Sequence, residues 1–163
     1  MGSKDLVLWT AKQEIGGIGP RKPTTEQLDK YFRESGSGYT SYAAADSHTQ
    51  NNWCGIFAVY CLSMGGISCY WGINPQMNAW GICPLYDEIE VIHGSQGIRG
   101  GDVGVAASRS HHFLIEEVVD EYDYVACLEG NGDPPVNAQW MGGVLTAKSR
   151  TLSQVAWYYR VHY

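Results

Sequence analysis

The sequence changes character at Gly100 and Gly101, and this change limits the folds open to the chain more than any other feature. Before the two glycines the regular apolar patterns have helical spacing, whereas after them the apolar residues form short runs rich in β-branched and aromatic residues. We predict strands at residues 102–106, 113–119, 124–128, 144–147 and 156–161. Helices followed by strands are typical of an α+β fold. The chain is therefore predicted to pack N-terminal helices on a C-terminal antiparallel β-sheet.

Three helices are predicted before the strands begin. Ser3 caps a helix over residues 4–14, and a capping box of Thr24 and Gln27 starts the second helix. The third helix begins near Trp53 and ends at Gly65 and Gly66. Its apolar residues occur on all sides, which predicts that it is buried.

Two segments lack a regular pattern. Residues 39–52 are polar and irregular, and residues 67–100 are rich in glycine, proline and aromatic residues. In the second segment we predict only a short turn or helix near Asn78.

Size and charge restrict the class of protein and its partners. A chain of 163 residues fits one domain, over residues 1–163. The net charge of −6 argues against a nucleic-acid partner, because phosphate binding depends on clustered Lys and Arg. No apolar run reaches the roughly 20 residues that span a bilayer, so no membrane partner is expected. The amino terminus lacks the pattern of a signal peptide, and the five cysteines leave one thiol unpaired under any intramolecular pairing.

Cys54 stands at the start of the third predicted helix. Unpaired backbone N–H groups and the helix dipole favour a thiolate there. A thiolate nucleophile also needs a histidine that protonates the leaving amine, and a third group that orients the imidazole. His112 opens a predicted strand, and Glu129 and Asn131 lie at the end of the next. If that strand continues through residue 131, its period of two places both side chains on one face, where either could approach His112.

Four short motifs occur in a fixed order: Trp-Cys-Gly-x-Phe at 53–57, Gly-Asp-Val-Gly-Val at 101–105, His-Phe-Leu-Ile at 112–115 and Leu-Glu-Gly-Asn at 128–131. Together they resemble the CHAP amidase family, the cysteine- and histidine-dependent amidohydrolases and peptidases, and are similar to the wider NlpC-like group of cell-wall hydrolases. The resemblance covers about residues 53–161 and implies a papain-like fold. It also implies that Cys54 is the nucleophile and His112 the base, with Glu129 and Asn131 as the positions that orient the histidine.

His111 competes with His112 for the catalytic role. Adjacent strand residues face opposite ways, so we expect only one of the two to face Cys54. We favour His112, because the apolar run 113–115 follows it directly, as in the family.

The oxyanion of the tetrahedral intermediate needs hydrogen-bond donors, for which the backbone N–H of Cys54 and the side chain of Gln50 are candidates. No cysteine or histidine spacing is typical of a zinc site. No metal and no cofactor are therefore expected.

The resemblance implies hydrolysis of an amide bond in bacterial peptidoglycan, as an N-acetylmuramoyl-L-alanine amidase or as an endopeptidase of the stem peptide or cross-bridge. A compact acidic catalytic domain without a signal peptide fits an antibacterial effector that is secreted or delivered to the periplasm of a target cell. Such a toxin is expected to have a cognate immunity protein.

Two alternatives remain open at this point. The same chemistry would serve a papain-like protease, a deamidase or a transglutaminase-like toxin that acts on a host protein. A binding module with a decayed site is a different class, which the intact set of Cys54, His112, Glu129 and Asn131 disfavours.

Overall fold

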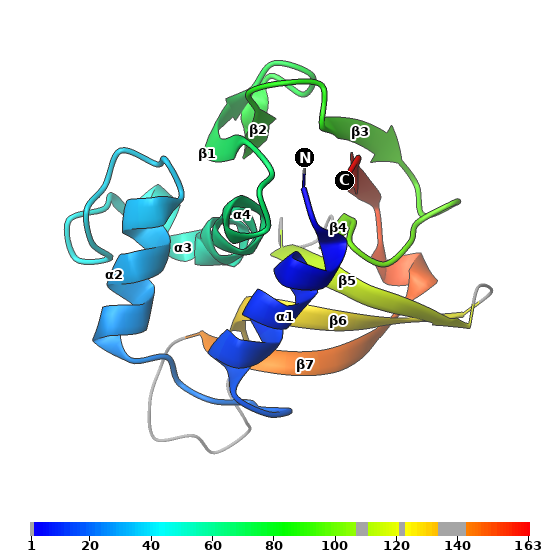
Figure 1. Cartoon of the computed structure of the whole chain (residues 1–163), viewed down its shortest axis with the longest axis horizontal. Helices are drawn as coiled ribbons and strands as arrows, with labels where there is room; N and C mark the ends of the chain where they lie inside the picture. The colour runs from blue at the N-terminus through cyan, green and yellow to red at the C-terminus, as the bar shows by residue number, and fades with distance from the viewer. Residues whose placement is uncertain (1, 107–110, 121–122, 134–142) are drawn as a thin grey trace.

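The computed structural model describes residues 2–106, 111–120, 123–133 and 143–163 (Figure 1). The helices are α1 (Lys4–Ile15), α2 (Thr25–Glu34), α3 (Ser47–Asn51) and α4 (Trp53–Met64). The strands are β1 (Cys69–Asn74), β2 (Ala79–Pro84), β3 (Ile89–His93), β4 (Val103–Ala106), β5 (His111–Asp120), β6 (Tyr124–Gly132), β7 (Val144–Thr151) and β8 (Trp157–Val161). A short 3-10 helix, η1 (Leu152–Gln154), precedes β8.

The main sheet has the strand order β3-β8-β4-β5-β6-β7, and every neighbouring pair is antiparallel. Strands β1 and β2 form a separate antiparallel hairpin. In Figure 1 this hairpin lies next to the end of α4 and apart from β5, β6 and β7.

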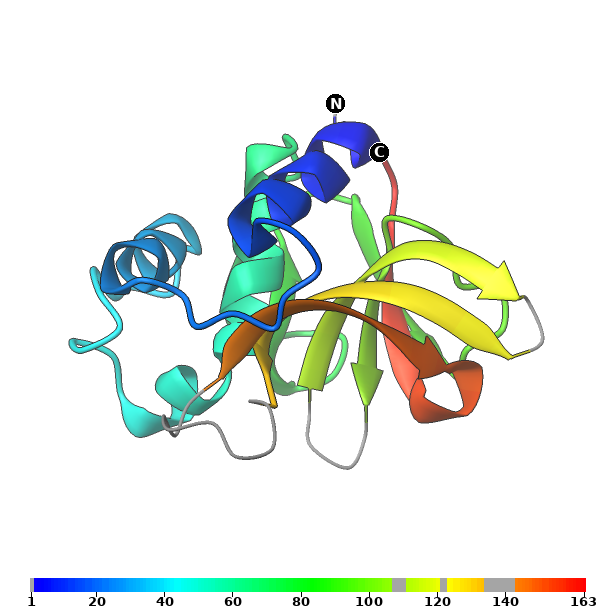
Figure 2. The same cartoon turned by 90° about the horizontal axis from the view of Figure 1, so that it is seen from below.

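Helices α1 and α4 cover one face of the sheet, as the two perpendicular views show (Figures 1 and 2). The main core lies between these two helices and the sheet, and it includes Leu114 of β5 and Leu128 of β6. Because strand residues alternate between the two faces, Phe113 and Cys127 belong to a second core cluster on the opposite face. The sheet therefore separates two packed regions.

Helix α4 is buried along nearly its whole length, from Trp53 to Leu62. This burial is what its all-round apolar sequence predicts. The capping box of Thr24 and Gln27 is also present at the start of α2. Helices followed by an antiparallel sheet give the predicted α+β, papain-like arrangement.

The prediction was wrong for residues 67–100, where β1, β2 and β3 form, and it missed the short helix α3. Glycine weakens the interior of a strand, so a sequence that contains it is not recognised as a strand. Here Gly72 pairs with Gly81 in the middle of the hairpin. Packing explains the glycine at position 81, because a Cβ on Gly81 would lie 2.4 Å from the hydroxyl of Tyr159. The predicted turn near Asn78 is present between the two strands.

All five cysteines lie in described segments, and each is a buried free thiol. Within the described ranges, none of the helices combines the length and apolar character that crossing a bilayer requires.

Candidate active site

Cys54 is the second residue of α4, among the first N–H groups of the helix, which lack intrahelical acceptors. The next residue, Gly55, lets the indole of Trp71 approach the helix, since a Cβ at Gly55 would lie 2.1 Å from that ring. Asn52 bonds the carbonyl of His48 through Nδ2, at 2.7 Å, where α3 meets α4. The thiol is thus held at a tightly packed helix N-terminus.

The first residues of β5 meet this helix terminus. Nδ1 of His112 lies 3.8 Å from Sγ of Cys54, and the backbone N–H of His112 donates to the same sulfur at 3.4 Å. Residues 58 positions apart in the sequence are therefore in contact. The side chains of both residues are almost completely buried.

The carboxylate of Glu129 contacts the other histidine. Its Oε1 lies 2.8 Å from Nε2 of His111, and Arg150 donates to both carboxylate oxygens, at 2.6 and 2.8 Å. The expectation that Glu129 orients His112 is wrong for this structure. His111 and Glu129 lie on the sheet face opposite to His112, so the alternation of strand residues separates Glu129 from His112.

Asn131 does not share the face of Glu129. A register shift interrupts the pairing of β6 with β7 between Glu129 and Gly132, and Asn131 has a left-handed φ of 53°. A bulge of this kind breaks the period of two on which the prediction relied. Nδ2 of Asn131 instead donates to the carbonyl of Asn51 at 2.8 Å, and so ties the end of β6 to α3.

His112 contacts the thiol, and both histidines contribute to the pKa of Cys54. Burial raises the pKa of Cys54, but hydrogen bonding with His111 and then with His112 outweighs this effect and lowers the pKa to about 6. His111 is the first residue of β5. At the end of a strand, the alternation of side chains between the two faces does not exclude an interaction of His111 with the thiol.

The pKa of His111 shifts in the opposite direction. Burial lowers it, but the interactions with Cys54 and Glu129 prevail and raise it to about 9. Burial also raises the pKa of Glu129, and the bonds from Arg150 and His111 more than compensate, so that the carboxyl pKa is lowered. The two shifts have opposite signs and together favour a thiolate at Cys54 and an imidazolium at His111.

The remaining thiols differ from Cys54. Burial raises the pKa of each of them: Cys61, Cys69, Cys83 and Cys127. Cys54 is therefore the one of the five cysteines whose pKa is lowered, and reactivity toward electrophiles increases with the thiolate fraction.

The other predicted groups contribute less to this cluster. Nε2 of Gln50 donates to the carbonyl of Tyr42 at 2.9 Å, and its role as an oxyanion donor stays a prediction.

Among the residues that the structure describes, no group of three or more His, Cys, Asp or Glu side chains could hold a metal ion. Sequence reasoning missed Arg150, because the predicted strand ended before it.

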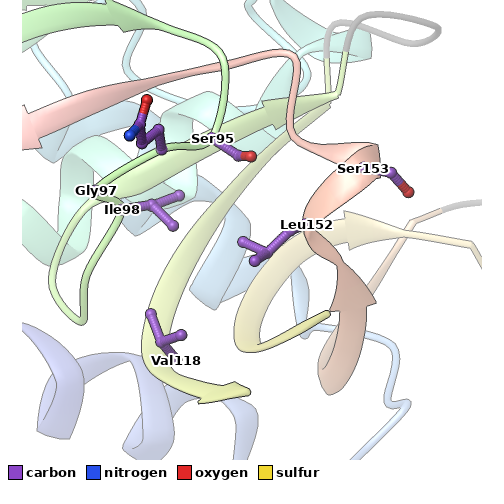
Figure 3. Close-up of a pocket in the computed structure, with 7 residues that line it drawn as sticks. Ser95, Gly97, Ile98, Val118, Leu152 and Ser153 are labelled. Carbon is purple, nitrogen blue, oxygen red and sulfur yellow. The ribbon is translucent and has the colours of Figure 1, made fainter. Parts of the chain in front are cut away.

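A separate pocket lies near the second core cluster (Figure 3). The described residues that line it are Ser95, Gln96, Gly97, Ile98, Val118, Leu152 and Ser153. Ile98 belongs to the second core cluster, and Val118 and Leu152 pack against it. None of these lining residues carries a titratable side chain, so the pocket supplies no acid or base.

The fold is similar to that of a solved endolysin. The crystal structure of the wild type endolysin LysIME-EF1 matches with a TM-score of 0.51 at 15% sequence identity. The match covers 100% of this chain and 66% of that chain, so this chain spans just under two thirds of the endolysin's length. No protein-family model and no curated protein matches the sequence.

Proposed function

We propose that the chain is a cysteine hydrolase that cleaves an amide bond of bacterial peptidoglycan. Cys54 is the nucleophile, His111 is the acid and base, and Glu129 orients His111. The observations that carry this proposal are the lowered pKa of the Cys54 thiol, to which His111 contributes, and the bond of His111 to a buried carboxylate. This is the arrangement that thiolate catalysis requires.

The reaction follows from the ion pair. The thiolate of Cys54 attacks the amide carbon, and the resulting oxyanion lies near the N-terminus of α4, where backbone N–H groups favour a negative charge. His111 gives its proton to the amide nitrogen, the C–N bond breaks, and the amine leaves. Water then loses a proton to His111, attacks the thioester carbon and releases the acid and the thiolate. The bonds between Glu129 and His111 and between Glu129 and Arg150 keep the imidazole in place through both steps.

His111 is better placed than His112 for this proton transfer. The residue is 9% exposed, whereas His112 is 2% exposed and is enclosed by aromatic side chains. Because Glu129 accepts from Nε2 of His111, the Nδ1 atom remains to exchange a proton with sulfur and substrate. The base is therefore reassigned from His112 to His111 in this proposal.

Two independent features support peptidoglycan as the substrate. The sequence motifs around Cys54 and Glu129 resemble those of a family of cell-wall amidases. The structurally similar LysIME-EF1 is an endolysin, a peptidoglycan hydrolase. Amide bonds of the stem peptide, of the cross-bridge and between muramic acid and L-alanine all suit thiolate chemistry.

The test is digestion of purified sacculi, followed by mass spectrometry of the released fragments. The wild-type chain should release muropeptides with one new amine and one new carboxyl terminus, which identifies the bond. The Cys54→Ala variant should release none, while Cys69→Ala, which removes a buried thiol that lies beside Ser63, should retain the activity. An equal digest by the Cys54→Ala variant would refute the proposal. Inert sacculi together with ammonia release from a protein glutamine would instead assign the site to a deamidase.

A further inference from the structure

His112 lies against the nucleophile but in surroundings unlike those of His111. Its ring stacks on Tyr159, at a centroid distance of 5.8 Å and an angle of 22°, and meets Trp71 and Trp157 edge-on, at 5.2 and 6.2 Å. An imidazole enclosed in this way is badly placed to exchange protons with solvent or substrate. It is well placed to hold a fixed hydrogen bond.

A chain of hydrogen bonds leads from the β1–β2 hairpin to this ring. The backbone N–H of Ile82 donates to Oη of Tyr159 at 3.1 Å, and Oη lies 3.3 Å from Nε2 of His112. Burial raises the pKa of Tyr159, so the hydroxyl keeps its hydrogen at neutral pH. The Ile82 N–H uses one acceptor site of Oη, and the hydroxyl hydrogen can point at Nε2 of His112.

The direction of the bond between Tyr159 and His112 determines the tautomer of His112. If Nε2 accepts from Tyr159, the ring hydrogen must be on Nδ1. Nδ1 is the atom that faces Sγ of Cys54, at 3.8 Å. The backbone N–H of His112 reaches the same sulfur, at 3.4 Å. One residue can thus present two donors to the thiolate.

We propose that His112 is a positioning residue, which holds the sulfur of Cys54 as an oriented thiolate through Nδ1–H and its backbone N–H, with Tyr159 fixing the required tautomer. Proton transfer remains with His111. This inference rests on the proposed role of Cys54 as the nucleophile. It gives the two adjacent histidines different tasks, one on each face of β5.

The described titratable groups around the sulfur are few. His112 of β5 contacts it directly and His111 of β5 contributes to its pKa, while Tyr159 of β8 bonds the ring of His112 and Glu129 of β6 bonds the ring of His111. Arg150 of β7 contacts Glu129 rather than the sulfur. A change at His112 or Tyr159 should therefore be visible in the titration of the thiol.

The experiment measures the rate of Cys54 alkylation by iodoacetamide as a function of pH. His112→Leu removes the Nδ1 donor, and Tyr159→Phe removes the hydroxyl that fixes the tautomer. Each should raise the apparent thiol pKa by about one unit, which slows alkylation about tenfold at pH 5. His112→Asn, whose side-chain amide can occupy the place of Nδ1–H, should restore a rate within about twofold of wild type.

Tyr158→Phe is the matched control. Tyr158 is the neighbouring buried tyrosine, its hydroxyl donates to the carbonyl of Gln96, and it belongs to the second core cluster. Its loss should leave the alkylation profile unchanged. Circular dichroism establishes whether each variant is folded. If His112→Leu does not fold, the alkylation rate of Tyr159→Phe tests the inference instead.

Long-range ¹H–¹⁵N NMR of the imidazole rings tests the tautomer directly in the wild-type chain. A hydrogen on Nδ1 alone is expected for His112, and hydrogens on both nitrogens are expected for His111. A hydrogen on Nε2 of His112, an unchanged profile in folded His112→Leu and Tyr159→Phe, or a His112→Asn variant as slow as His112→Leu would overturn the inference. The alkylation assay uses no peptidoglycan, so inactivity on sacculi would refute the proposed function and leave this inference to be decided separately.

Discussion

Nε2 of His111 lies 2.8 Å from Oε1 of Glu129, and the same carboxylate is held by two bonds from Arg150. The carboxylate accepts from both neighbours, so Nε2 of His111 must carry a hydrogen. The bond fixes the imidazole through Nε2, and Nδ1 is the ring nitrogen that the proposed mechanism uses. Because Arg150 neutralises the buried carboxylate, Glu129 can stay ionised inside the protein.

The first prediction concerns pH dependence. With a thiol pKa of about 6 and an imidazole pKa of about 9, the ion pair exists between these values. On a soluble muropeptide, kcat/KM should therefore rise as pH passes 6 and fall as it passes 9. The two limbs report the coupled pair rather than either residue alone.

Glu129→Gln provides the control for this profile. Loss of the carboxylate removes an interaction that raises the pKa of His111, so the falling limb should move to lower pH. A wild-type activity that rises only near pH 8.5, the ordinary pKa of a thiol, would contradict the ion pair.

The second prediction distinguishes the two histidines. His111→Asn removes the acid and base and should lower kcat/KM by roughly 10²- to 10⁴-fold, the usual effect of losing such a group. His93→Asn, an exposed histidine at the end of β3, should have wild-type activity. A larger loss in His112→Asn than in His111→Asn would return the role of base to His112.

The third prediction concerns stability. Arg150→Met removes the cation that neutralises Glu129, and also the contact of the guanidinium with the ring of Phe113, at 4.7 Å. A buried carboxylate that keeps only His111 as a partner should lower the free energy of unfolding by about 3 kcal/mol, as measured by urea denaturation. Lys148→Met, at an exposed position on the same strand, should change it by less than about 0.5 kcal/mol. Equal unfolding curves for the two variants would show that Arg150 does not stabilise the site.

Much of the fold could be predicted because local patterns agree with it. The capping box before α2 and the all-round apolar sequence of α4 are signals carried by a few neighbouring residues. The hairpin of β1 and β2 carries no such signal. Its paired glycines, Gly72 and Gly81, are explained by the neighbouring tyrosine side chains, including that of Tyr159 from a distant strand.

The candidate site was predictable in part for a similar reason. A cysteine at a helix start and a histidine at a strand start can be recognised locally, and the structure brings Cys54 and His112 together. Which histidine meets Glu129 depends on the register and faces of β5 and β6, which two adjacent histidines leave ambiguous. The bulge that turns Asn131 away is likewise a property of strand pairing.

The last prediction tests the packing around the nucleophile. Alanine in place of glycine within a helix ordinarily stabilises it by about 0.5–1 kcal/mol. At Gly55 we expect the opposite, because the added Cβ would lie 2.1 Å from the indole of Trp71. Forcing the ring away should cost about 1–3 kcal/mol and disturb its contact with His112, so Gly55→Ala should lower both the melting temperature and the alkylation rate of Cys54.

A double-mutant cycle with Trp71→Phe isolates this clash. The smaller phenyl ring leaves room for the methyl group, so the double variant should lose less stability than the two single variants together. If the two losses simply add, the contact between Gly55 and Trp71 does not limit the helix terminus. A coupling of about 1 kcal/mol or more would show that a glycine after the nucleophile is required by the aromatic wall beside it rather than by the backbone of α4.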